Sequence, residues 1–62
     1  MGVALIDIKK VPTGNKFSIV VFDAVGIHEH IVTGYTNCRE KVDVLKKALR
    51  QKGYGVEIQN SD

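Results

Sequence analysis

Hydrophobic and polar positions follow two different periods along the chain. Three segments in the first half are rich in β-branched, aromatic and other apolar residues, as is typical of strands. These segments are Val3–Val11, Phe17–Asp23 and Ile27–Tyr35. The turn-forming cluster Pro12 to Asn15 separates the first two segments, and Gly26 separates the second from the third. Short turns between consecutive strands favour antiparallel pairing, so we predict a three-stranded meander.

After the third segment the apolar positions recur with a helical period. They stand at steps of four, three and four residues: Cys38, Val42, Leu45 and Leu49. This spacing predicts one apolar stripe on an amphipathic helix. Asn37 and Glu40 have the spacing of a capping box, so we expect Asn37 to be the N-cap. Gly53 is expected to end the helix, because glycine readily adopts the positive φ found there.

The chain ends with a fourth alternating segment. Tyr54, Val56 and Ile58 alternate with smaller or polar residues up to Gln59, which predicts a strand. We expect residues 60–62 to lie beyond it as a frayed end. A helical crossover between strands is normally right-handed and makes the strands it joins parallel. The prediction is therefore a single α+β domain over residues 1–62, ordered β-β-β-α-β. Its four-stranded, mostly antiparallel sheet should have the strand order 3-2-1-4, with the helix on one face.

One face of this sheet has no predicted cover. An antiparallel sheet with one solvated face should alternate apolar with polar residues. The segment Phe17–Asp23 is instead apolar on both sides, and Leu5 continues the second apolar side on the first strand. The residues expected on the uncovered side are Leu5, Val20, Phe22 and Ala24. An uncovered patch of this kind indicates a partner surface, and we favour homodimerisation. The alternatives are cover by the chain's own loops, its C-terminal tail or a strongly coiled sheet, and cover by another protein or a hydrophobic ligand.

The charge of the chain is concentrated on the predicted helix. Its formal net charge is +2, and residues 38–52 alone carry +4. Four basic residues share an outward face at helical spacing: Arg39, Lys46, Lys47 and Arg50. Such a face could contact phosphates, which makes nucleic-acid binding the alternative function. Asp43 stands within one turn of three of them, as in ordinary solvated helices, and no exposed aromatic residues are interleaved for base stacking. We therefore rank this function second.

Candidate chemistry is limited to two histidines and one cysteine. His28 and His30 point to the same side of a strand, and Cys38 is a conceivable third metal ligand. A structural zinc site needs a fourth ligand, which the sequence does not supply. Cys38 lies in the first helical turn, where the helix dipole lowers a thiol pKa, but it also opens the apolar stripe. We favour surface histidines and a structural cysteine, and predict no enzyme activity, catalytic residue, metal or cofactor. If the histidines lay on a partner face, association would depend on pH, because histidine is the side chain that changes its charge near neutral pH.

The number of cysteines and the hydropathy limit the cellular environments expected for the chain. A single cysteine excludes an intrachain disulfide, and 62 residues are enough for one domain. No apolar run approaches the roughly 20 residues of a membrane helix. We therefore expect a cytoplasmic, non-membrane protein.

The sequence Gly34-Tyr35-Thr36, followed by a helix through Leu49, resembles the YegP-like family of small bacterial proteins. In that family a strand meander ends in a similar turn that leads into a helix. The resemblance covers about a third of the chain, through this tripeptide and the order of elements. The family's typical turn residues and small helical alanines are largely missing here. The resemblance implies a compact α+β unit that pairs or repeats, and it implies no catalytic residue.

Overall fold

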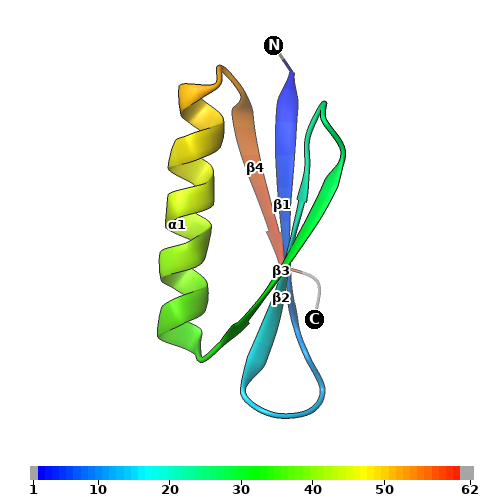
Figure 1. The fold of residues 1–62 in the computed structure, drawn as a ribbon, viewed down its shortest axis with the longest axis vertical. Coiled ribbons are helices and arrows are strands. Elements are labelled where there is room, and N and C mark those ends of the chain that lie inside the picture. Colours follow the sequence, from blue (N-terminus) through cyan, green and yellow to red (C-terminus); the bar gives the residue numbers. More distant parts are fainter. Residues whose placement is uncertain (1, 61–62) are drawn as a thin grey trace.

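A computed structural model describes residues 2–60. Four strands and one helix account for most of these residues (Figure 1). Their bounds are β1 Val3–Lys10, β2 Lys16–Phe22, β3 Ile27–Thr33, α1 Tyr35–Gln51 and β4 Gly55–Asn60. The predicted α+β class and the order β-β-β-α-β are confirmed. Asn60 belongs to β4 rather than to a frayed end, whereas residues 61–62 lie outside the described residues.

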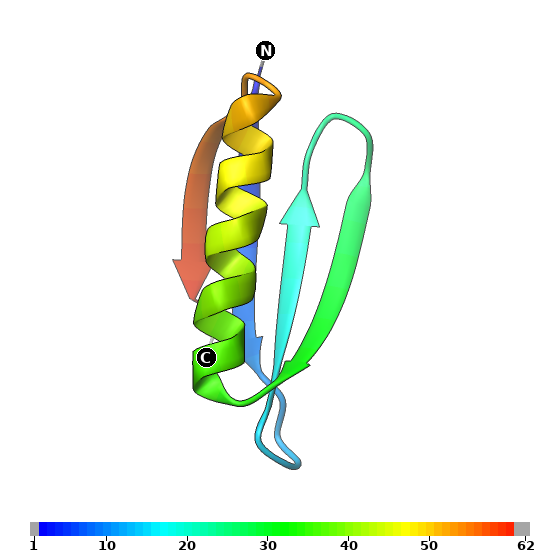
Figure 2. The same cartoon turned by 60° about the vertical axis from the view of Figure 1, so that its left-hand side comes forward.

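The strands form one mixed sheet in the order β3-β2-β1-β4. The pairs β1–β2 and β2–β3 are antiparallel, and β4 is parallel to β1, as predicted. Figure 2 shows α1 crossing in front of β1, with β4 on one side and the β2–β3 hairpin on the other. The described residues thus make two layers, a sheet and a single helix on one of its faces.

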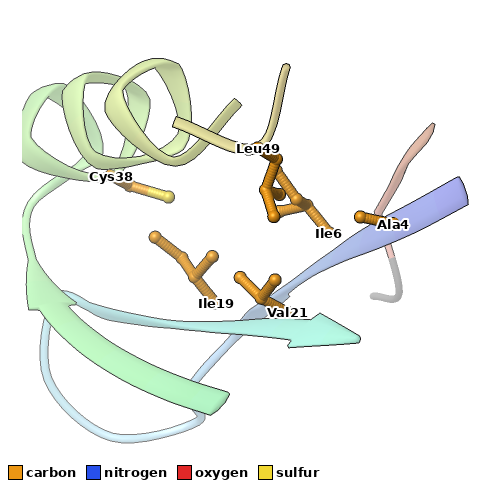
Figure 3. Packing of buried hydrophobic residues seen from close by; sticks show 6 residues of the cluster. All are labelled: Ala4, Ile6, Ile19, Val21, Cys38 and Leu49. Carbon is orange, nitrogen blue, oxygen red and sulfur yellow. The ribbon is translucent and has the colours of Figure 1, made fainter. Parts of the chain in front are cut away.

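The core lies between α1 and the middle of the sheet. Its buried members are Ala4, Ile6, Ile19, Val21, Cys38 and Leu49. Four of these side chains come from β1 and β2 and point toward the helix, as the strand alternation requires. The other two come from α1 and point toward the sheet (Figure 3). Val42 and Leu45 pack against this cluster while remaining half-buried, so the predicted helical stripe is confirmed. Burial of these apolar side chains is the main force that joins the layers.

The predicted start of the helix is wrong. Helix α1 begins at Tyr35 with Gly34 as its N-cap, and no side chain caps it. Gly34 has φ +91°, and its backbone N–H donates to the Asn15 carbonyl at 2.7 Å. Instead of capping, the Asn37 side-chain amide donates backward to the Thr33 carbonyl at 2.7 Å. The contact with Asn15 ties the helix entry to the β1–β2 turn, which local spacing cannot reveal.

The predicted end of the helix is confirmed and has Schellman geometry. Gly53 has φ +95° and follows the C-cap residue Lys52. The N–H of Gly53 donates to the Arg50 carbonyl at 3.0 Å, and that of Tyr54 donates to the Leu49 carbonyl at 3.1 Å. These two bonds satisfy carbonyls that the helix leaves free, and they turn the chain into β4.

Replacing Gly53 by alanine tests this turn. We expect Gly53→Ala to lower the free energy of unfolding by about 1–2 kcal/mol, because a Cβ opposes the left-handed conformation. Gly55→Ala is the control, since its added Cβ would meet only Val3 Cγ2 at an ordinary 3.9 Å. Urea unfolding followed by circular dichroism measures both variants. Equal losses of unfolding free energy in the two variants would contradict backbone strain from a Cβ at position 53.

Shortening a core side chain tests the packing between the layers. Ile19 is fully buried. We expect Ile19→Val to cost about 0.5–1.5 kcal/mol, a large share of the about 3–9 kcal/mol total for a chain of this size. Val44→Ala on the exposed side of α1 should cost little in the same urea titration. A loss at Val44 as large as that at Ile19 would contradict the assigned core.

Candidate functional site

The face of the sheet that points away from α1 carries a group of apolar side chains. Strand register places Leu5, Phe22 and Ile27 in one row across β1, β2 and β3. The neighbouring alternate positions complete what we call the open-face patch, defined as Val3, Leu5, Val20, Phe22, Ile27 and Ile31. No element within residues 2–60 lies over this face.

The open-face patch is exposed at its edges and bordered by polar residues. Ile27 is 69% exposed and Val3 63%, whereas Leu5 and Val20 in the middle are half-buried. Beyond Val20, Ser18 donates a hydrogen bond of 2.8 Å to Glu29 Oε2 across the β2–β3 pair. An apolar centre with a polar border is the usual composition of an interaction surface.

Three of the four predicted face residues lie on this surface. Leu5, Val20 and Phe22 share it through their register, as the alternation indicated. Ala24 does not belong to it, because β2 ends at Phe22 and Ala24 lies in the following turn. The Ala24 N–H donates to Tyr54 Oη at 3.3 Å, which ties that turn to the segment after the helix.

The basic residues of α1 do not act as one uniform face. Arg39 and Lys46 border a groove between the first half of α1 and the sheet, whereas Lys47 and Arg50 do not. The ammonium group of Lys47 instead binds Asp43 Oδ2 at 3.1 Å, one helical turn away. This hydrogen bond and the nearby charge of Lys47 lower the pKa of Asp43. Pairing of Asp43 with a helical neighbour agrees with the sequence-based expectation.

The groove beside Arg39 lies on the helix side and is larger than a second depression there, which the two histidines line. It has a volume of about 700 Å³ and reaches the ends of β1 and β4 and the start of β2. Ile8, Phe17 and Val42 line its apolar part, and Lys10, Arg39 and Lys46 are its basic residues. The rings of Phe17 and Tyr35 meet edge to face, with centroids 6.2 Å apart.

Sequence inspection missed this aromatic pair. The expectation that no exposed aromatic residue accompanies the basic ones is wrong at Tyr35, which is 64% exposed. The rings come from the start of β2 and the start of α1, which are 18 residues apart. The guanidinium of Arg39 lies 5.9 Å from the Tyr35 ring centroid, and Lys10 Nζ lies 5.5 Å from that of Phe17. Only the Tyr35–Arg39 spacing of one helical turn was visible in the sequence.

The two histidines lie on the helix side of β3, opposite the open-face patch. Their register partners are the core residues Val21 and Ile19. They line the smaller depression, next to Leu45 and Lys52, so they cannot make association through the open face pH-dependent by direct contact. No group of three histidine, cysteine or acidic side chains among residues 2–60 is placed to hold a metal ion.

Asp23 organises the turn that precedes β3. Its Oδ1 accepts hydrogen bonds from the N–H groups of Val25 and Gly26 at 2.9 and 3.0 Å, and lies 3.6 Å from His28 Nε2. Desolvation raises the pKa of Asp23, but the two backbone bonds, with His28 and Lys52, outweigh it and hold that pKa below its ordinary value. The carboxylate therefore serves the turn as a charged acceptor.

Cys38 is a core residue rather than a reactive one. Its side chain is 4% exposed and points from α1 toward Ile19 (Figure 3). Burial raises the pKa of its thiol, which agrees with the structural cysteine favoured from the sequence and not with the alternative of a thiol activated by the helix dipole. The thiolate is the reactive form, and it is disfavoured here.

Comparison with known proteins identifies no relative of this chain. No family model matches the chain, and neither the curated proteins nor the solved structures contain a significant match. The YegP-like resemblance therefore stays a prediction. Within the part of the chain that the structure describes, no helix has the length and apolar character to cross a bilayer.

Thiol labelling tests the burial of Cys38. At pH 8 we expect iodoacetamide to react at least ~100-fold more slowly with the folded chain than with the chain in urea, because labelling requires opening of the core. A short cysteine peptide in both solutions controls for the effect of urea on the reagent. Equal rates for folded and unfolded protein would contradict the burial.

Proposed function

We propose that the chain is a non-enzymatic interaction module that works as a homodimer joined through the open-face patch. The observation that carries this proposal is the row formed by Leu5, Phe22 and Ile27, which is apolar across three strands on a face without cover in the described residues. Burial of apolar area drives most protein association, and a symmetric dimer is the commonest arrangement.

The charges around the patch favour a second copy over a partner of opposite charge. The open face carries acidic residues at Asp7, Glu29 and Glu57 and basic residues at Lys9 and Lys16. A surface with both signs can complement itself across a two-fold axis, whereas a surface of one sign would select a different partner. Two such sheets would pack face to face about 10 Å apart.

The area of the open face determines how tightly two copies are expected to bind each other. Four strands that pair over six or seven residues cover an area of about 20 × 19 Å. Two copies would then bury about 760 Å², which is below the about 1,000 Å² of a stable specific interface and corresponds to a weak dimer. We expect a dimer whose population rises with protein concentration. A small domain gains disproportionately from such association, because its own core is limited.

Light scattering on a sizing column tests the proposed dimer. We expect the wild-type chain to approach twice the mass of one chain at the higher of two concentrations, and Phe22→Glu to remain a monomer at both. Phe22 is partly exposed, at 36%, so its replacement should leave the circular dichroism spectrum unchanged. A wild-type chain that is monomeric at both concentrations would overturn the homodimer.

Val44→Glu is the matched control for this experiment. Val44 is 59% exposed on α1, so the substitution adds the same charge to the other layer of the molecule. It should leave the dimer intact. A Phe22→Glu variant as dimeric as Val44→Glu would show that the copies meet elsewhere.

A further inference from the structure

The groove between α1 and the ends of the strands combines aromatic, apolar and cationic groups in one place. Its apolar part consists of the side chains of Ile8, Phe17 and Val42, beside the core. Tyr35, which is 64% exposed, stands at its border in edge-to-face contact with Phe17. Because Tyr35 is mostly exposed and Phe17 is only half-buried, part of their ring surface is available to a ligand.

Cations accompany both rings. Arg39 lies over Tyr35 and Lys10 over Phe17, at 5.9 and 5.5 Å from the ring centroids. Lys46, half-buried on the same flank of α1, is the third basic residue of the lining. Aromatic surface next to positive charge is the combination with which proteins hold single nucleotides of a strand, the base stacking and the cations meeting the phosphate.

The acidic residues of the groove do not cancel this charge. Glu40 and Asp43 also line it. Asp43 is bound by Lys47, which lies outside the groove, at 3.1 Å. The lining with this outer lysine therefore carries an excess of positive charge, and an anionic ligand is favoured over a cation.

We propose that this groove binds a nucleotide unit, with the base against Tyr35 and Phe17 and the phosphate near Arg39, Lys46 and Lys10. Its volume of about 700 Å³ lies within the about 300–1,000 Å³ typical of small-molecule sites. The unit is either a free nucleotide or part of a single strand, since both present the same base and phosphate. The groove lies on the helix side of the sheet, so the proposal is independent of the dimer through the open face.

Amide chemical shifts of the isotope-labelled chain test the site with three probes at low salt: AMP, a single-stranded octamer of deoxyadenosine, and inorganic phosphate. We expect changes at the first half of α1 and at the adjoining ends of β1 and β2. AMP binding identifies a free nucleotide as a sufficient ligand, and binding of the octamer alone identifies a strand; either result supports the proposal. Phosphate binding as tightly as both nucleotide probes, shifts confined elsewhere, or no shifts with any probe would overturn it.

Two variants and a control separate the site from general charge effects. Tyr35→Ala and Lys46→Gln should each weaken the binding of the productive probe by about 10-fold, through lost stacking and lost charge. Lys41→Gln removes the same charge from a half-buried lysine of α1 that does not line the groove, and should change the affinity less than twofold. Lys41→Gln weakening binding as much as Lys46→Gln would overturn the assignment. Phe22→Glu should bind as well as the wild type, so a failed dimer and a failed nucleotide site are distinguishable.

Discussion

The fold depends on how its sheet is covered. A sheet of four strands has two faces, and the helix can cover only one of them. On the covered side, Ile6 and Ile19 are fully buried beneath α1. On the other side, strands β1, β2 and β3 continue their apolar pattern without a layer to pack against in the described residues. Both faces of β2 therefore favour burial, but the single helix satisfies only one, and the proposed dimer would satisfy the second.

Local sequence signals were sufficient for the architecture. β-Branched and aromatic content between turn residues identified the first three strands, and alternation identified the fourth. The steps between Cys38 and Leu49 identified the buried side of α1. The end at Gly53 was also visible, because a positive φ there follows from local backbone sterics. Each of these features depends on residues close together in the chain, which is why the sequence reveals them.

The features that the sequence did not reveal depend on contacts between distant segments. Helix α1 starts at Tyr35 rather than after Asn37, because Gly34 donates its N–H to the Asn15 carbonyl. The aromatic pair of Phe17 and Tyr35 is likewise a product of the fold. The strand alternation correctly placed Leu5, Val20 and Phe22 on the open face. It wrongly placed Ala24 there, because an apolar pattern does not show that β2 ends at Phe22.

The parallel pairing of β4 with β1 has a consequence for the order in which the molecule assembles. Val3 lies opposite Gly55 across that pair, so the contact closes a loop of almost the whole chain. The two hairpins β1–β2 and β2–β3 involve short separations and can form quickly, whereas this closure costs more chain entropy and comes late. Until then β1, which carries the fully buried residues Ala4 and Ile6, is an edge strand with free backbone groups. The last stage of folding therefore covers this edge of β1 and prevents it from pairing with a strand of another molecule.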